Sequence, residues 1–396
     1  MAAFQAMYAA GFNLAAPNFL GYRPADYAAA FGHDNVITAL HAIGVDLSAR
    51  NAYGGSPAHV AAGRGHANVI RALRVAEVDL AARDLHGFAP AHIAAQYGDE
   101  GVINALSAAG VDLAARNRYG VAPLHIAARE GHANLIGPLR AAGVDPDAQC
   151  AQGLAAVHFA AREGHADVIA ELHAVGADLN AKNRQGFAAV HIAARYGHVN
   201  VLRELRAAGA DLNARNDHGF AAIHVAARYG NVDVIEALRV AGADLAARNS
   251  FGGAAVHIAA ARGHAAVVRA LYTAGVDVTT RNGEEMAALH IAARHGHADV
   301  VEELRVIGVD LTVRNAEGLG AAHIAAQHGH ASVIVVLRAA GVDLTARTVR
   351  SRFGRGGRRP AQYARAGGHE ALANQLAMQR PPTPRNPISC LGCRVM

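Results

Sequence analysis

Apolar residues recur along the chain in two alternating patterns, each of which predicts a short helix. In one representative stretch, small residues follow Gly219 as far as Gly230. Beyond it, Val234, Ile235 and Leu238 stand at positions i, i+1 and i+4, which places them on one face of a second helix. Gly230 favours the end of the first helix, because glycine enters the left-handed region at little cost. Neither helix can bury its apolar side alone, so we expect neighbouring helix pairs to stack.

The same pattern repeats every 33 residues along most of the chain. A histidine keeps this spacing at His59, His92, His125, His158, His191, His224, His257, His290 and His323. A Gly-His step keeps it at His33, His66, His132, His165, His198, His264, His297 and His330. An aspartate keeps it at Asp46, Asp79, Asp112, Asp145, Asp178, Asp211, Asp244, Asp277, Asp310 and Asp343. Such a fixed period is the sequence signature of a stacked repeat array.

These repeats resemble ankyrin repeats. The likeness is carried by the segments HIAARxGH and G-A/V-D-L-x-A-R-N, and the segments Ser56–His59 and Pro123–His125 are nearest to the family's T-P-L-H motif. The resemblance implies an all-α repeat solenoid, in which helix-turn-helix units are joined by hairpin-like turns. Members of this family bind partner proteins through the turn tips and the first helices. The resemblance therefore implies a protein–protein interaction scaffold.

The repeat register divides the chain into five segments. Residues 17–346 are predicted to form the ankyrin repeats, and residues 1–16 resemble the second half of an incomplete repeat, which would act as an N-terminal cap. Residues 347–359 are predicted to form an Arg/Gly-rich loop that pushes the last repeat six residues out of register. Residues 360–378 resemble a degenerate capping repeat, and residues 379–396 are expected to be a flexible Pro-rich tail.

Two positions depart from the repeat pattern in ways that should cost stability. Gly137 and Pro138 fall inside a second helix, where proline is expected to kink or break the helix. Glu77 occupies a position that is glycine in the neighbouring repeats, at a cost of up to about 1 kcal/mol if the backbone there is left-handed. We expect residues 137–150 to be the softest joint of the array, with the weakest protection in hydrogen exchange.

Composition and charge exclude several classes of protein. The chain has 396 residues, of which 52% are hydrophobic, so it is not a disordered chain, and its three cysteines cannot support a disulfide scaffold. It shows no run of 18 apolar residues and no secretory signal, so an intracellular, cytoplasmic location is expected. Residues 347–396 carry ten Arg and one acid, a charge of +9, which leaves −4 for residues 1–346. A slightly acidic body argues against nucleic acid as a partner.

The 24 histidines raise the question of metal binding or acid–base catalysis. Stacked repeats place equivalent residues about 8–10 Å apart, whereas zinc–nitrogen bonds are about 2 Å long. We therefore interpret the repeated histidine as a hydrogen-bonding residue that ties its turn to the neighbouring repeat. The sequence also has no H-E-x-x-H motif, phosphate-binding glycine loop or nucleophile elbow. We expect no metal, no cofactor, no catalytic residues and no enzymatic activity.

Aromatic and arginine side chains mark the surface that we expect to bind partner proteins, because such residues are enriched in interface hot spots. They stand in the turns, directly after the turn glycine, or at the end of the first helix. The candidate residues are Phe88, Tyr97, Tyr119, Phe187, Arg195, Tyr196, Phe220, Arg228, Tyr229 and Phe251. Tyr196, Arg228 and Tyr229 are the strongest candidates. The alternative is that the apolar members merely pack turn against turn.

The last residues carry a candidate lipidation signal. The segment Cys393–Met396 fits the C-a-a-X prenylation motif, and its terminal Met favours a farnesyl group, although arginine at the first a position is not ideal. Cys390 is a candidate palmitoylation site. One lipid chain gives only marginal anchoring. Six arginines between Arg347 and Arg359 would add about 1 kcal/mol each near an anionic membrane surface, the alternative being a simply solvated loop.

Two functions are consistent with these features. The first is a protein–protein interaction scaffold or adaptor, farnesylated at Cys393 and held at the cytosolic face of a membrane. The second is a soluble ankyrin adaptor, such as a ubiquitin-ligase substrate receptor, in which the C-terminal cysteine is unmodified. In both cases the partner is one or more proteins bound to the grooved face of the array.

Overall fold

The computed structural model describes residues 6–7, 9–19, 21–348 and 357–379, and every structural statement below concerns these residues. The chain divides into two compact units, Met1–Asp217 and His218–Met396, here called unit 1 and unit 2. Both consist of short helices joined by turns, and the described residues contain no strand beyond the isolated bridges of Arg281 with Ala287 and of Arg314 with Gly320. The predicted all-α repeat solenoid is confirmed.

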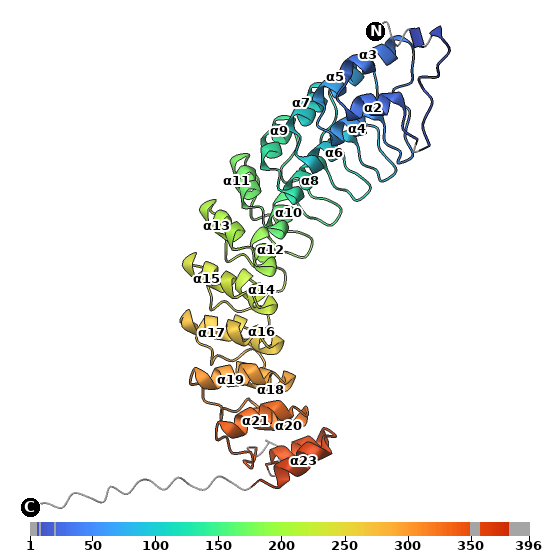
Figure 1. The fold of residues 1–396 in the computed structure, drawn as a ribbon. Coiled ribbons are helices and arrows are strands. Elements are labelled where there is room, and N and C mark those ends of the chain that lie inside the picture. Colours follow the sequence, from blue (N-terminus) through green and yellow to red (C-terminus); the bar gives the residue numbers. More distant parts are fainter. Residues whose placement is uncertain (1–5, 8, 20, 349–356, 380–396) are drawn as a thin grey trace, which may run out of the picture. The chain divides into compact units, whose positions relative to one another are not determined.

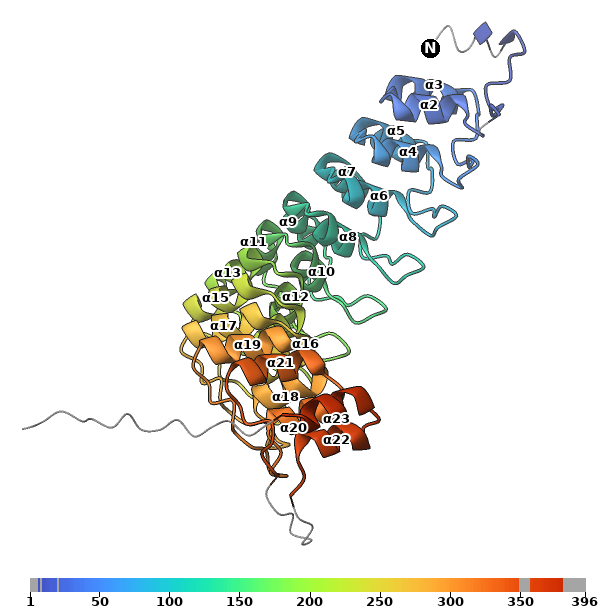
Figure 2. The ribbon, with the colours of Figure 1, turned by 60° about the horizontal axis from the view of Figure 1, so that its bottom comes forward.

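Unit 1 consists of stacked helix pairs, each with a first and a second helix. The first helices are α2 (Pro24–Ala30), α4 (Pro57–Gly63), α6 (Pro90–Tyr97), α8 (Pro123–Glu130), α10 (Ala156–Glu163) and α12 (Ala189–Tyr196). The second helices are α3 (Asp34–Ala42), α5 (Ala67–Val75), α7 (Glu100–Ala108), α9 (Ile136–Ala141), α11 (Ala166–Ala174) and α13 (Val199–Ala207). The two sets form separate layers (Figure 1), and the turns extend from the first helices away from the second (Figure 2).

Unit 2 has the same plan. Its first helices are α14 (Ala222–Tyr229), α16 (Ala255–Arg262), α18 (Ala288–His295), α20 (Ala321–Gln327) and α22 (Pro360–Ala366). Its second helices are α15 (Val232–Val240), α17 (Ala265–Thr273), α19 (Ala298–Val306), α21 (Ala331–Ala339) and α23 (Glu370–Ala377). Helix α22 packs against both α20 and α23, so a helix pair stands where the sequence suggested a degenerate capping repeat.

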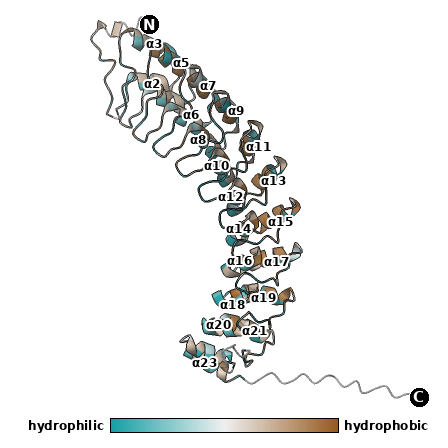
Figure 3. Cartoon of the chain, turned by 180° about the vertical axis from the view of Figure 1, so that it is seen from behind, coloured by the Kyte–Doolittle hydropathy of each residue, from teal (hydrophilic) through white to brown (hydrophobic). Residues whose placement is uncertain are grey.

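The core lies between the two helix layers and is built from the apolar positions of the repeat. In α15, Val234, Ile235 and Leu238 are at most 1% exposed. Burial of each such aliphatic side chain contributes about 1.5–3 kcal/mol. Hydrophobic residues accordingly run through second helices such as α15 and α17 (Figure 3). The first helices bury alanines instead, such as Ala226 and Ala227, whose small side chains allow close packing of helices between repeats.

The turns are held by the same hydrogen bonds in successive repeats. In one of them, Asn282 Oδ1 accepts from the backbone N–H groups of Glu284 and Met286 at 3.0 and 2.9 Å. An arginine next to this asparagine reaches the following turn: Arg281 Nη2 donates to the carbonyl of Arg314 at 2.7 Å. A turn of this kind is thus fixed internally and tied to its neighbour.

The Arg/Gly-rich segment 347–359 begins and ends as a turn of the array. The backbone N–H of Thr348 donates to the carbonyl of Arg358 at 3.0 Å, and the N–H of Arg358 donates to Thr348 Oγ1 at 2.9 Å. In the preceding turn, Asn315 N–H donates to the Leu319 carbonyl at 2.9 Å. The paired bases are equivalent, so the six extra residues are accommodated within one turn. Residues 349–356 lie outside the described residues.

The second helix that contains Pro138 is continuous but irregular, because its first turn is a 3₁₀ turn. A short 3₁₀ turn, Ala133–Leu135, precedes α9, which has six residues, whereas the equivalent helix α11 has nine. Pro138 therefore stands in the first turn of α9, where backbone N–H groups make no hydrogen bond within the helix, so the N–H group that proline lacks is not missed there. That residues 137–150 are the softest joint stays a prediction.

Two glutamates adopt the left-handed backbone conformation. Glu77 has φ of +56°, so it adopts the left-handed backbone that the glycines at this position of neighbouring repeats suggested. Glu285 has the same φ and was not predicted, although it stands 33 residues after the turn glycine Gly252. Within the described part of the chain, no helix is long and apolar enough to cross a membrane.

Candidate protein-binding surface

The repeated histidine of the first helices is a structural residue. His92 is 1% exposed, its Nδ1 accepts the backbone N–H of Ala89 at 3.2 Å, and its Nε2 donates to the carbonyl of Val121 in the next turn at 3.1 Å. A carbonyl can only accept, so this arrangement requires a neutral ring with its proton on Nε2. Burial lowers the pKa of His92 to about 4, against the opposing effect of the bond to the Val121 carbonyl. The interpretation of this histidine as a tie between repeats is confirmed.

Other histidines of both series make equivalent ties. Burial also lowers the pKa of His59, His125 and His158 in unit 1 and of His257, His290 and His323 in unit 2. In the Gly-His series, His132 Nε2 donates backwards to the carbonyl of Gln96 at 3.0 Å, and His297 Nε2 to that of Ala261 at 3.2 Å. The described residues contain no group of three or more His, Cys, Asp or Glu side chains placed to hold a metal ion.

The predicted tyrosines at the ends of first helices are exposed. Tyr97, Tyr196 and Tyr229 end α6, α12 and α14, and their exposed fractions are 63%, 46% and 42%. The Arg195 guanidinium carbon lies 5.4 Å from the Tyr196 ring centroid, and that of Arg228 lies 6.0 Å from the Tyr229 ring centroid. These distances are in the range of cation–π contacts. The structure thus brings together one predicted Arg–Tyr pair in unit 1 and one in unit 2.

The remaining predicted binding residues fall into two groups. Tyr119 and Phe251 lie in turns and are exposed by 59% and 66%. Phe88, Phe187 and Phe220 are only half-buried and do not join the tyrosines. Each lies edge-on against the histidine of its own repeat (His92, His191 and His224), with ring centroids 5.8, 5.6 and 5.7 Å apart. These three phenylalanines cover core histidines, so the seven exposed residues are the better candidates for partner contacts.

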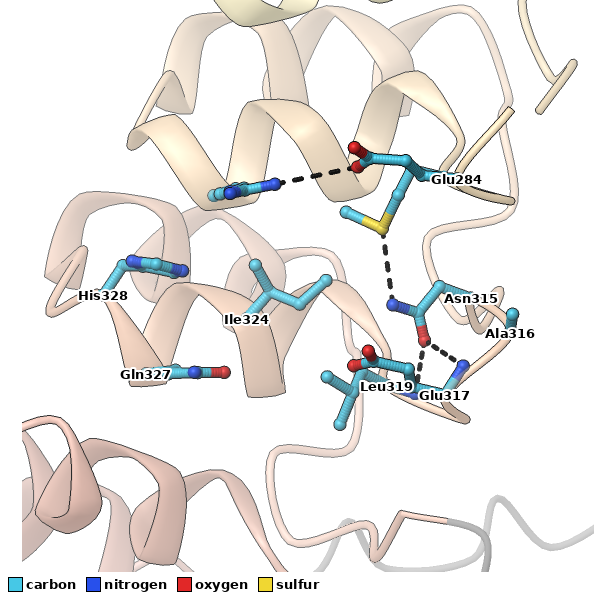
Figure 4. A pocket seen from close by; sticks show the side chains of 10 residues that line it. Glu284, Asn315, Ala316, Glu317, Leu319, Ile324, Gln327 and His328 are labelled. Atoms are coloured by element: carbon cyan, nitrogen blue, oxygen red, sulfur yellow. Dashed lines mark hydrogen bonds and ion pairs between the residues drawn. The ribbon is translucent and has the colours of Figure 1, made fainter. Parts of the chain in front are cut away.

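A groove of about 430 Å³ in unit 2 lies along the repeats that contain α18 and α20 (Figure 4). It is lined by Glu284, Met286, Arg294, Asn315, Ala316, Glu317, Leu319, Ile324, Gln327 and His328. Glu284 pairs with Arg294 at 3.8 Å, and Asn315 Nδ2 donates to Met286 Sδ at 3.3 Å. Glu284 and Glu317 give the turn side of this groove acidic groups, and Arg294 gives the helix side a basic one. The two acids were missed from sequence, although both stand at the turn-tip register.

A second groove, here called the N-terminal groove, lies across α2, α4 and α6 in unit 1 and has a volume of about 580 Å³. Its lining includes Tyr22, Tyr27, Phe31, Val60, Gly63, Arg64, Ile93, Gln96 and Tyr97. Of these, only Tyr97 was predicted as a binding residue. The 33-residue register could have pointed to this groove. Ala30 and Gly63 stand at the repeat position at which later repeats carry Arg129 and Arg162, so two small residues replace long side chains there.

Asp26 also lines the N-terminal groove, and it replaces the repeated histidine in the first complete helix pair. It is 1% exposed, and its Oδ2 accepts the backbone N–H of Arg23 at 2.8 Å. Its Oδ1 is buried without a hydrogen-bond partner. Burial raises the pKa of this carboxyl group, against the bond and the positive charge of Arg23. The residue was not singled out from the sequence, although it stands 33 positions before His59.

The predicted lipidation residues Cys390 and Cys393 lie outside the described residues. So does the middle of the Arg/Gly-rich segment. At its two ends, Arg347, Arg358 and Arg359 are exposed.

Stacked helix pairs with exposed Tyr and Arg on the first helices and turns define a class of protein, the repeat arrays that bind other proteins. The family model for ankyrin repeats matches residues 26–117, 124–216, 223–315 and 289–383, and the chain belongs to this family. No curated protein matches the chain. Ankyrin repeats are protein–protein interaction modules, and the predicted family is confirmed.

Proposed function

We propose that the protein is an ankyrin-repeat scaffold that binds partner proteins through its first helices and turns and is tethered to a membrane by farnesylation of Cys393. The observation that carries the binding part is the exposed pairing of Arg195 with Tyr196 and of Arg228 with Tyr229. A tyrosine offers a large contact area with few rotatable bonds, and a stacked arginine is already held in place. Each pair can therefore bind a partner at a small cost in side-chain entropy.

The tether is supported by the C-terminal sequence and by its basic surroundings. Cys393 begins the segment Cys393–Met396, which has the C-a-a-X pattern. A single prenyl chain binds membranes only reversibly, so a second signal is needed. Cys390 offers a second acylation site. The exposed Arg347, Arg358 and Arg359 offer attraction to anionic lipid of about 1 kcal/mol for each charge near the surface.

Fractionation of eukaryotic cells tests the tether. We expect the wild-type chain in the membrane fraction and Cys393→Ser in the cytosol, because serine cannot be prenylated. Cys390→Ser should be partly released, and Ser389→Ala should remain with the membranes as a matched control. A wild-type chain found entirely in the cytosol would leave the soluble adaptor as the function.

Alanine substitutions test the binding surface. Proteins are first cross-linked to the full-length Cys393→Ser chain and identified by mass spectrometry. The triple variant Tyr196→Ala, Arg228→Ala, Tyr229→Ala should then lose at least one of these partners. Tyr272→Ala is the control, because Tyr272 is a 48% exposed tyrosine on the second helix α17. Retention of every partner by the triple variant contradicts the proposed surface.

A further inference from the structure

Two first helices carry an arginine that packs on the aromatic ring directly after it. The Arg195 guanidinium carbon lies 5.4 Å from the Tyr196 ring centroid, and Arg228 makes the same contact with Tyr229 at 6.0 Å. The Tyr196 ring also stacks on His198, with centroids 6.3 Å apart and ring planes 18° apart. A guanidinium beside an aromatic ring is thus an arrangement that this position of the repeat accommodates.

In the first complete helix pair, the ring and the histidine are present but the arginine is replaced. Phe31 stands at the repeat position of Tyr196 and is 68% exposed. Its ring stacks on His33 with centroids 6.3 Å apart and ring planes 28° apart, as Tyr196 stacks on its own histidine. The position that Arg195 occupies in the later repeat is Ala30 here. The N-terminal groove therefore presents an aromatic ring at a position from which the chain supplies no guanidinium.

Further rings line the same groove on helices α2, α4 and α6, which lie side by side (Figure 1). Tyr27 and Tyr97 have exposed fractions of 48% and 63%, and the Tyr22 ring centroid lies 6.1 Å from that of Tyr27. A Cβ atom at Gly63 would lie 3.8 Å from Tyr97 Cε2, so the Tyr97 ring borders the space that a longer side chain would fill. The faces of such rings attract cations.

The groove also contains a buried carboxylate. Asp26 is 1% exposed, lines the groove and has no hydrogen-bond partner at Oδ1. The positive charge that acts on it is that of Arg23, whose Nη1 donates to the carbonyl of Arg50 at 2.6 Å. Arg64 in the groove lining is exposed, so water screens its charge. Water screens the charge of Asp26 poorly, so this carboxylate attracts a cation that enters the groove.

We propose that the N-terminal groove binds an arginine side chain of a partner protein, which takes the place of the arginine that later repeats carry at the positions of Ala30 and Gly63. The guanidinium group is planar and weakly hydrated and stacks on aromatic rings, which favours arginine over lysine. The chain's own pairs at this position of the repeat are also arginines. This inference rests on the proposed protein-binding function, but it depends neither on lipidation nor on the Arg–Tyr pairs.

Ligand-observed NMR with the full-length chain measures this binding by saturation transfer. The probe is a capped tripeptide with arginine between two glycines, so the arginine carries no free terminal charges. We expect saturable binding with a dissociation constant of about 1 mM. The same tripeptide with citrulline, which keeps the shape of arginine without its charge, should bind at least about tenfold more weakly. The lysine tripeptide should also bind more weakly, by about threefold.

Two variants locate the binding site. Ala30→Arg supplies the missing arginine from the chain itself and should weaken binding of the arginine tripeptide at least about tenfold, and arginine is a good helix former. Asp26→Asn removes the charge at constant size and should weaken binding by about the same factor. Ala42→Arg is the matched control, because it adds the same charge at an exposed position of α3 that is not in the groove lining. Its affinity should equal that of wild type.

Three results would overturn the proposal. One is the absence of saturation at tripeptide concentrations up to about 10 mM. Another is equal binding of the arginine and citrulline tripeptides. The third is unchanged affinity of Ala30→Arg or of Asp26→Asn, with circular dichroism showing that the variant is folded. None of these results would refute the proposed function, because the triple variant at Tyr196, Arg228 and Tyr229 tests that surface separately.

Discussion

Acidification should unfold the array through its buried histidines, at pH values well above those that protonate most carboxylates. His92 is held neutral by two hydrogen bonds, and its Nδ1 cannot accept the Ala89 N–H once it carries a proton. Its pKa is lowered by burial, so the unfolded chain takes up the proton first. The stability contributed by the neutral ring is therefore complete above about pH 6.5 and is lost as the pH falls toward 4.

The size of the effect follows from the two pKa values of His92. A histidine that titrates near 6.5 when unfolded and about 4 when folded costs about 2 kcal/mol of unfolding free energy between pH 7.5 and pH 5. Burial lowers the pKa of three further histidines in unit 1: His59, His125 and His158. Whole domains are stable by only about 5–15 kcal/mol, so losses at several histidines together are decisive.

Urea denaturation followed by far-ultraviolet circular dichroism at pH 7.5, 6.5, 5.5 and 5.0 measures the effect. The matched variant is His92→Gln, because the chain itself uses glutamine at this register: Gln362 Oε1 accepts the backbone N–H of Arg359 at 2.9 Å. We expect His92→Gln to be less stable than wild type at pH 7.5 and to show a smaller loss between pH 6.5 and pH 5. The difference in slope should approach about 1.4 kcal/mol for each pH unit.

Two outcomes would refute this reasoning. If His92→Gln and wild type lose stability with the same pH dependence, the buried ring does not control acid unfolding. If the wild type gains stability on acidification, the histidine is protonated in the fold, and the assigned hydrogen bonds are wrong.

Three further substitutions should stabilise the protein, each measurable as a shift in the urea midpoint. Cys150 is buried at the repeat position at which other turns carry asparagine. Cys150→Asn should therefore add two hydrogen bonds within the turn and raise the unfolding free energy by about 1 kcal/mol. An unchanged unfolding free energy would mean that this turn has a different shape. Pro138→Ala should let the α-helix begin three residues earlier, which should raise the unfolding free energy by about 1–3 kcal/mol. Hydrogen exchange at residues 133–141 should become slower, and unchanged exchange there would contradict the prediction. Asp26→Asn should remove a buried carboxylate, whose raised pKa means that its ionisation destabilises the fold as the pH rises. We expect a gain of about 1 kcal/mol in unfolding free energy at pH 7 that disappears near pH 3, where the carboxyl group is neutral. An equal gain at both pH values would show that charge is not the cause.

Much of the fold was accessible from sequence because each repeat specifies itself locally. The placement of Val234, Ile235 and Leu238 on one helix face predicted their burial, and the irregular first turn of the helix that contains Pro138 followed from the chemistry of proline. The left-handed backbone of Glu77 followed from comparing it with glycines one period away. These are properties of short segments, and stacking does not alter them.

The binding surface was less accessible because it depends on which neighbours a side chain meets. Phe88 and Tyr97 are both aromatic residues of one repeat, yet Phe88 packs on His92 and Tyr97 is exposed. The N-terminal groove was missed because it depends on the lack of a long side chain at Gly63, where later repeats carry arginine. Comparing each register column would have identified Gly63 and Asp26 as exceptions, but only coordinates show that both line the same groove.

The turn that joins Thr348 to Arg358 shows that a turn can be lengthened without changing how the helices on either side of it stack. Its base closes with backbone pairing like that of the shorter turns, so material added at the tip is not transmitted to the stack. The array therefore tolerates foreign sequence at its turn tips while every helix keeps its partners. Peptide epitopes or binding loops grafted between residues 316 and 317 should be displayed without refolding the repeats of unit 2, and this makes the protein suitable for engineering as a display scaffold.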